Sequence, residues 1–243
     1  MNIIKLNAID STNTYLRQQS IKYLLNDFTV VVAKSQFNGR GQMGTVWDAQ
    51  ADKNLTFSVF KRNEGVTIDH HFYISIVTAL AIIKSLQSMQ IPRLFVKWPN
   101  DILSEQKKVC GILIENVIKN NAIIGSIIGI GLNVNQKSFN NLPQASSLLN
   151  ITGRVYNLEE LLISIVSNMK LYFEQLEKRD IPALKRAYEA LLFRKNKPST
   201  FKNVDGDLFS GFIKGIDNSG NLIVLLEDDF LKTFSFKEIQ LLY

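Results

Sequence analysis

Two lysines, an amide and a carboxylate stand close together near the middle of the chain: Lys97, Asn100, Asp101 and Lys108. An apolar run at 94–96 predicts a short strand before them. Pro99 is expected to end it, because proline lacks a backbone donor and restricts the preceding residue. After a polar loop, a second strand is predicted to begin at Lys108. Cations and a carboxylate at neighbouring strand ends could offset charge on an anionic substrate or accept a proton. On the residues alone, a hairpin with solvated charges at its tip fits equally well.

Three glycines follow the spacing G-x-G-x-x-G at Gly39, Gly41 and Gly44. This spacing occurs in dinucleotide-binding loops, where a helix must begin directly after the glycines. Here Thr45-Val46-Trp47, a polar loop and an alternating strand at 55–60 follow, so we reject a dinucleotide-binding loop. The stretch at 39–47 instead predicts a flexible flap whose backbone donors can approach a phosphate.

The composition indicates a globular protein with a sizeable core, since 46% of the 243 residues are hydrophobic. The apolar run at 72–83 is shorter than the roughly 20 residues of a membrane span, and no signal peptide is recognisable. The single cysteine, Cys110, excludes a disulfide within the chain and indicates a reducing compartment, so we expect a cytoplasmic protein with a buried, inert thiol. The net charge of +6 is scattered along the chain, which does not favour nucleic-acid binding.

Hydrophobic periodicity and capping residues predict the order of the elements. Strands are expected at 3–9, 29–33, 55–60, 94–96, 109–117 and 122–134, and helices from Ser11 to Leu25, from Asp69 to Met89, after Asn157 and from Asp180 to about Leu192. Short alternating strands then follow from Ser199 to Tyr243. We place a domain boundary near Lys195, which gives a first domain at 1–194 and a second at 195–243.

Five short motifs occur in order along the chain: S-T-N at 11–13, Q-x-x-G-R-G at 36–41, K-W-P-N-D at 97–101, K-x-x-G-I-L-x-E at 108–115 and G-I-G-x-N at 129–133. In this order they resemble the motifs of the biotin–protein ligases. The chain starts directly at the expected first catalytic strand, so it resembles the monofunctional members that lack an N-terminal helix-turn-helix. The segment after the predicted boundary resembles the family through its strand pattern only.

The resemblance implies an α+β fold, with a mixed, mostly antiparallel sheet and packed helices as in class II synthetases, followed by a small SH3-like β-barrel. It implies an enzyme that uses ATP and Mg²⁺ to form biotinyl-5′-AMP and then transfers biotin to a specific lysine. That lysine would belong to a biotin carboxyl carrier protein domain of acetyl-CoA carboxylase or a related carboxylase. No specific DNA binding and no membrane association are expected. The oligomeric state stays open, a homodimer included.

The resemblance also assigns roles to individual residues. The catalytic residues would be Lys108, Arg40, Asp101 and Lys97. Biotin would contact Ser11, Thr12, Asn13, Gln36, Gly39, Arg40, Trp47, Lys108 and Gly111. ATP would contact Arg40, Lys97, Asn100, Lys108 and Asn133. No metal ligands are identified, because His70 and His71 are adjacent and point to different faces of their predicted helix.

Two positions of the flap depart from the family pattern. Gln42 and Thr45 stand where typical relatives have arginines, so Met43, Val46 and Trp47 are expected to close the flap by apolar contact. The sequence alone also leaves two other functions open. A lipoate ligase or octanoyltransferase would have a similar fold, and a biotin-sensing regulator would bind without turnover; the K-W-P-N-D and G-R-G motifs favour a biotin ligase.

Overall fold

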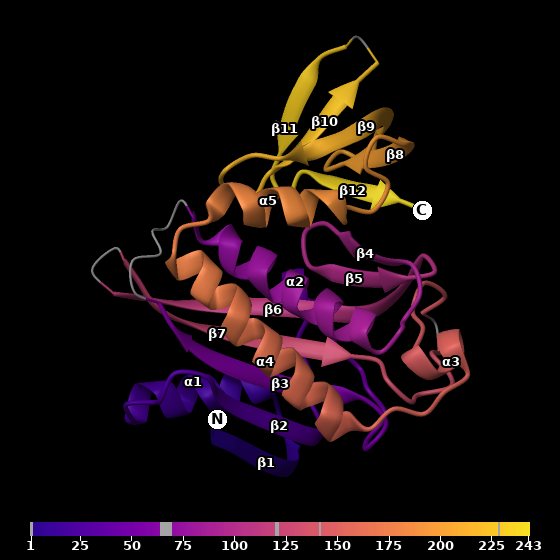
Figure 1. Ribbon diagram of the computed structural model, residues 1–243. Helices are drawn as coiled ribbons and strands as arrows, with labels where there is room; N and C mark the ends of the chain where they lie inside the picture. Colours follow the sequence, from indigo (N-terminus) through magenta and orange to yellow (C-terminus); the bar gives the residue numbers. More distant parts are fainter. Residues whose placement is uncertain (1, 64–69, 120–121, 141, 228) are drawn as a thin grey trace.

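Two β-sheets organise the computed structural model, which describes residues 2–63, 70–119, 122–140, 142–227 and 229–243 (Figure 1). The larger sheet has the strand order β1-β2-β3-β7-β6-β5-β4. Its strands are β1 (Asn2–Ile9), β2 (Thr29–Gln36), β3 (Leu55–Arg62), β4 (Leu94–Lys97), β5 (Asp101–Ser104), β6 (Lys107–Lys119) and β7 (Ala122–Leu132). Only the pair β1–β2 of this sheet is parallel among the described strands, so the predicted mixed, mostly antiparallel sheet is confirmed.

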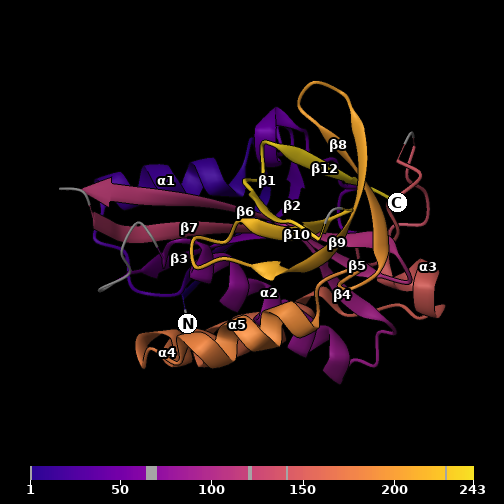
Figure 2. The same cartoon turned by 90° about the horizontal axis from the view of Figure 1, so that it is seen from above.

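Helices cover both faces of the larger sheet (Figure 2). They are α1 (Thr12–Lys22), α2 (Phe72–Ser88), α3 (Leu148–Thr152), α4 (Leu158–Glu177) and α5 (Ile181–Ala190). Neighbouring residues of a strand face opposite sides, and this alternation separates two hydrophobic cores. Val30 belongs to the larger core with α2 and α4, whereas Val31 packs with Leu16 of α1 on the other face.

The smaller sheet is antiparallel, with the order β11-β10-β9-β8-β12. Its strands are β8 (Pro198–Asn203), β9 (Leu208–Ile216), β10 (Leu222–Leu226), β11 (Leu231–Phe234) and β12 (Ile239–Leu242). Figure 1 shows this sheet at one end of the molecule, beside α5. Its buried side chains Phe201, Ile213 and Phe234 join the larger hydrophobic core. The division of the chain at residues 194 and 195 stays a prediction.

Strand β5 was not predicted, because the sequence indicated the end of a strand at Pro99 and then a polar loop up to Lys108. β5 and β6 form a hairpin through Glu105 and Gln106, whose φ angles are 50° and 67°. Two-residue hairpin turns of this kind usually contain asparagine or glycine, so the pair Glu105-Gln106 does not predict a turn. Helix α1 ends at Lys22 rather than the expected Leu25.

Most other expected elements are confirmed within a few residues. Asn157 caps α4 by accepting from the backbone N–H groups of Glu159 and Glu160. The expected cap Asp69 lies outside the described residues, and α2 begins at Phe72. Cys110 is fully buried, as predicted. None of the helices in the described ranges is long and apolar enough to cross a membrane.

One contact ties the smaller sheet directly to the K-W-P-N-D turn. The indole Nε1 of Trp98 donates a hydrogen bond to the carbonyl oxygen of Gly220 at 2.8 Å. Gly220 has a φ of +88°, and a Cβ at this position would overlap the ring of Phe72 at the start of α2. The turn between β9 and β10 therefore needs glycine for two separate reasons, its backbone conformation and its packing.

Gly220→Ala is expected to destabilise the protein more than Gly206→Ala, the matched change in the turn between β8 and β9. Gly206 has a similar φ of +94°, but a Cβ there would come no closer than 3.7 Å to Lys202. Both variants have an unfavourable backbone, whereas only Gly220→Ala also overpacks the core, at an additional cost of about 1–3 kcal/mol. Urea unfolding measures the difference, and equal losses for the two variants would contradict the packing argument.

Candidate active site

A cavity of about 500 Å³ lies between the first turn of α1, the flap, the turn at 98–100, β6, β7 and the smaller sheet. Eleven of the thirteen predicted site residues line it: Ser11, Thr12, Asn13, Gln36, Arg40, Trp47, Lys97, Asn100, Asp101, Lys108 and Gly111. Gly39 and Asn133 are not among the lining residues. The fold therefore brings most of the predicted residues together, although they come from four separate stretches of the chain, 11–13, 36–47, 97–101 and 108–111.

Lys108 and Asp101 form an ion pair in the lining of this cavity. The ammonium nitrogen lies 2.7 Å from Asp101 Oδ1, and both side chains are largely shielded from solvent. The β5–β6 register changes from Ile102 opposite Cys110 to Leu103 opposite Lys108, so β6 has a bulge at this point. Bulges redirect side chains, and this one turns Lys108 to the side of Gly111.

Lys97 also lines the cavity, and Tyr243, which follows β12, lies beside it. Its Nζ lies 4.7 Å from the centre of the Tyr243 ring. Burial lowers the pKa of Lys97 below its ordinary value of 10.5; the Asp101 carboxylate opposes this change, and the nearby Lys108 adds to it. Burial and the same carboxylate raise the pKa of Tyr243 to about 12. A partly desolvated ammonium facing a cavity is a favourable partner for an anionic ligand.

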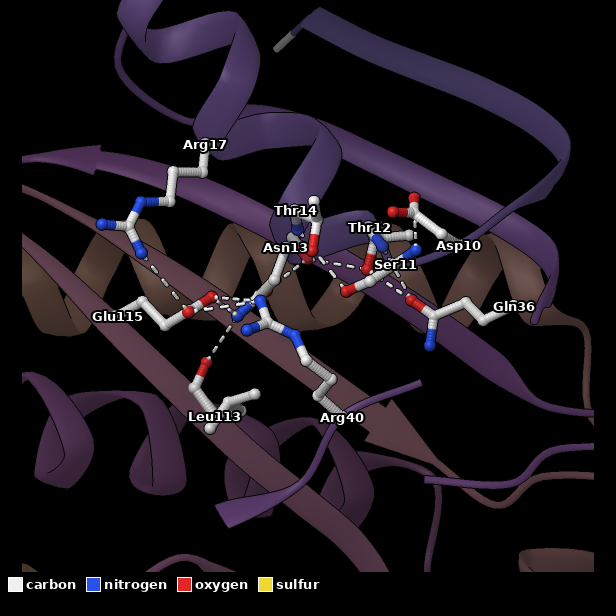
Figure 3. A network of polar contacts seen from close by, with 11 residues as sticks. Asp10, Ser11, Thr12, Asn13, Thr14, Arg17, Gln36, Arg40, Leu113 and Glu115 are labelled. Carbon is white, nitrogen blue, oxygen red and sulfur yellow. Dashed lines mark hydrogen bonds and ion pairs between the residues drawn. The ribbon is translucent and has the colours of Figure 1, made fainter. Parts of the chain in front are cut away.

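Polar groups at the start of α1 and at the end of β2 also line the cavity, and we call this part its polar end (Figure 3). Ser11 caps α1 by accepting from the backbone N–H of Thr14, as its sequence position predicted. Gln36 Oε1 accepts from both the backbone N–H and the hydroxyl of Thr12, at 2.8 and 3.0 Å. Since the oxygen of Gln36 is engaged, its Nε2 amino group is the end that can donate to a ligand.

The flap is held on the sheet by Trp47. Its indole packs over Gly111 and Gly131, and a side chain at Gly131 would overlap the ring. Lys108 Nζ lies 5.7 Å from the same ring. Three apolar side chains were expected to close the flap, and all three line the cavity; Trp47 packs on the sheet, whereas Met43 and Val46 are 71% and 74% exposed. Trp47 packs because two glycines leave room for it.

The glycines of the flap do not open a helix. A single three-residue 3-10 turn, η1 (Gln42–Gly44), follows Gly41 before the chain returns to an extended conformation. The rejection of a dinucleotide-binding loop is therefore confirmed. Gly39 closes the base of the flap, since its carbonyl accepts from the backbone N–H of Trp47 at 2.9 Å.

Two predicted nucleotide contacts have side-chain amides that bind the protein itself. Asn100 Nδ2 donates to the carbonyl of Ile112 at 2.9 Å, which ties the turn to β6. Asn133 Nδ2 donates to the carbonyl of Ser146 at 3.1 Å, and Asn133 is buried outside the cavity lining. Their predicted contacts with ATP stay predictions.

Sequence reasoning assigned no role to several groups that shape the site. Glu115 accepts from Asn13 and Arg40, and Ser58 Oγ bonds the Thr12 and Asn13 side chains. Residues of β8 and β12 and of the segment before β12 also line the cavity. Only Glu115 had a sequence signal, because it ends the K-x-x-G-I-L-x-E motif.

Residues 6–133, more than half of the chain, match the biotin/lipoate A/B protein ligase family. The chain belongs to this family. It is 27% identical over 212 residues to the bifunctional ligase/repressor BirA of Bacillus subtilis, a match that covers 85% of this chain and 64% of that protein. The chain thus spans somewhat less than two thirds of the Bacillus relative.

A shorter relative and a solved structure agree with the family membership. The biotin–[acetyl-CoA-carboxylase] ligase of Paracoccus denitrificans is 29% identical over 201 residues, which cover 80% of this chain and 82% of that protein. A biotin protein ligase from Aquifex aeolicus, solved in complex with biotin and ATP, superposes with a TM-score of 0.82 at 24% identity. That match covers 99% of this chain and 98% of the other, so this member of the biotin/lipoate ligase family has the same fold.

The lowered pKa of Lys97 can be measured without any substrate. We expect the Lys97 ammonium to lose its proton at a pH below 10.5, because burial disfavours the charged form. The measurement is an NMR titration of the lysine side chains, in which Lys97→Arg identifies the resonance by removing it. Titration at or above pH 10.5 would show that the ammonium is well solvated.

Proposed function

We propose that the protein is a biotin–protein ligase, which forms biotinyl-5′-AMP from biotin and ATP and then transfers biotin to one lysine of a carrier domain. The observation that carries this proposal is the convergence of Lys108, Lys97 and Asp101 with the polar end at Ser11 and Gln36 in one cavity. One end suits a neutral polar head group, and the other suits a carboxylate meeting a phosphate.

Biotin fits this arrangement with its ureido ring at the polar end. Ser11, Thr12 and Gln36 offer hydroxyl, backbone and amide groups to the ring carbonyl and N–H groups. Trp47, packed over two glycines, supplies an apolar wall for the ring and chain. The carboxylate of biotin then points toward Lys108.

In the first step, a carboxylate oxygen of biotin attacks the α-phosphorus of ATP, and the bond to pyrophosphate breaks. Both reactants are anionic, so the step requires positive charge around the phosphates. Lys108, Lys97 and Arg40 supply it from this chain. Charges fixed in place before the reaction need no reorganisation as the phosphate charge redistributes.

Mg²⁺ would enter with ATP rather than in a protein-built cage. Among the described residues, no group of three or more His, Cys, Asp or Glu side chains could hold a metal ion. Mg²⁺ in such sites keeps several waters and binds mainly through substrate phosphates, with one or two carboxylates. Asp101 is a carboxylate of the cavity, but it is paired with Lys108.

In the second step, the amine of the carrier lysine attacks the acyl carbon of biotinyl-5′-AMP. An amide bond forms, the acyl–phosphate bond breaks and AMP leaves. The amine must lose a proton, and we assign its acceptance, or the orientation of the amine, to the Asp101 carboxylate, which lies 2.7 Å from Lys108 Nζ.

The relatives support a carboxylase carrier as the partner, since the Paracoccus protein carries the name biotin–[acetyl-CoA-carboxylase] ligase. We propose the same class of acceptor for this chain, with the reaction taking place in the cytoplasm. The oligomeric state stays open, a homodimer included, and the lack of specific DNA binding stays a prediction.

The reaction itself is the first test. Incubation with biotin, ATP, Mg²⁺ and a purified carrier domain is expected to add one biotin to one lysine and to release AMP and pyrophosphate. Intact-mass spectrometry of the carrier measures the addition, and a carrier with arginine in place of the acceptor lysine is the control. Transfer of lipoate or octanoate but not of biotin would make the proposal wrong.

Lys108→Ala is expected to slow adenylate formation by about 10²-fold or more, the scale of losing one preorganised partner of the transition-state charge. The measurement is pyrophosphate release with biotin and ATP. Lys107→Ala is the matched control, because Lys107 is the adjacent lysine, is exposed and bonds only the carbonyl of Pro143 among the hydrogen bonds of the described residues. Near-normal release from Lys108→Ala would remove this lysine from the mechanism.

A further inference from the structure

The carboxylate of Glu115 lies where the flap, the first turn of α1 and strand β6 meet (Figure 3). Its Oε2 accepts from Asn13 Nδ2 at 2.8 Å and from Arg40 Nη2 at 3.0 Å, and its Oε1 lies 3.2 Å from the same Arg40 nitrogen. Arg17 Nη1 approaches Oε1 to 3.8 Å from the exposed side of α1. One carboxylate therefore holds two residues that we assign to the binding site.

The position of Glu115 on β6 follows from strand alternation. Gly111, Leu113 and Glu115 are two residues apart and face the same side of the sheet. Gly111 and Leu113 line the cavity, so Glu115 stands at its edge. The side chain is only 19% exposed, which distinguishes this carboxylate from an ordinary surface charge.

On one side, Glu115 fixes the orientation of a buried amide. Asn13 is 3% exposed, and its Nδ2 donates to Glu115 and to the carbonyl of Leu113. An ionised carboxylate only accepts hydrogen bonds, so the amino end of the amide must face β6. The amide oxygen of Asn13 then accepts from Ser58 Oγ at 2.6 Å, and Ser58 Oγ lies 2.7 Å from Thr12 Oγ1. The polar end of the cavity is thereby connected to Glu115.

On the other side, Glu115 holds the flap. Arg40 is the flap residue that we assign to the phosphate and biotin, and its guanidinium reaches across to β6. The ion pair uses the Nη2 group, which leaves the donors on Nε and Nη1 for a ligand. Trp47 attaches the flap to the sheet by packing, and Arg40 adds a charged attachment several residues earlier.

We propose that Glu115 is a positioning residue that couples the flap, through Arg40, to the polar end of the biotin pocket, through Asn13. The inference rests on the proposed function of the same site. Hydrogen bonds to a charged group are stronger than neutral ones, and the accepting Glu115 side chain is only 19% exposed, although the Arg40 side chain is 41% exposed. The three groups therefore stay in register before any ligand binds. Order that exists before binding lowers the cost of binding.

Glu115→Gln tests the proposal because it keeps the size and one acceptor oxygen but removes the charge. In the ligand-free protein, hydrogen exchange at the flap amides of Gly41 and Trp47 is expected to become faster. With biotin and ATP, the KM for biotin in pyrophosphate release is expected to rise by about tenfold, while kcat changes less. One lost contact between coupled groups typically has an effect of this size.

Arg17→Gln is the matched control for the charge of the network. Arg17 is 57% exposed and 3.8 Å from Glu115, so its removal is expected to leave the flap exchange and the KM for biotin unchanged. If Glu115→Gln lowers the KM, the ion pair competes with the ligand and the proposal is overturned. An unchanged flap exchange in Glu115→Gln overturns it as well.

A double-mutant cycle separates positioning from a general loss of stability. Arg40→Gln removes the residue through which Glu115 acts on the flap, so adding Glu115→Gln is expected to change the flap exchange little further. Additive effects of the two changes would overturn the coupling. If the unaltered enzyme makes no biotinyl-5′-AMP, the proposed function fails by itself, and the exchange measurements still decide the role of Glu115.

Discussion

The central ion pair of the site depends on one irregularity in the pairing of β5 with β6. In a regular strand, Lys108 and Gly111 would face opposite sides of the sheet, since they are three residues apart. The bulge in β6 puts Lys108 on the same side as Gly111 and within 2.7 Å of Asp101. Without it, the ammonium would point to the side that buries Cys110, where an unpaired charge is strongly unfavourable.

Two glycines of β6 and β7 shape the pocket because they have no side chain. Gly111 and Gly131 lie opposite each other in the β6–β7 register, and together they leave a flat area on the sheet. The Trp47 indole occupies it, which fixes the flap over the cavity without help from the exposed Met43 and Val46. The absence of side chains at Gly111 and Gly131 therefore allows Trp47 to pack on the sheet.

The charged side chains around Asp101 form the electrostatic feature of the cavity. Lys97 and Lys108 share one nearby carboxylate, Asp101, so positive charge is in excess at this end. Burial makes the Lys97 cation less favourable, as its lowered pKa indicates. An anionic ligand would offset this cost, which is why a site built from these residues suits a carboxylate and a phosphate. Tyr243, which follows β12 of the smaller sheet, contributes by placing its ring 4.7 Å from the Lys97 ammonium.

The sequence by itself determined the elements and most of the site, because helix caps, strand periodicity and motif residues depend on near neighbours in the chain. Asn157 at the start of α4 and the strand at 29–33 are examples. The bulge, the Glu-Gln hairpin and the contact of Trp98 with Gly220, 122 residues away, came only from the tertiary structure. So did the bond between Asn13 and Glu115, which are 102 residues apart. Register and long-range contacts are decided by how the sheets and helices pack together, and no local pattern encodes that packing.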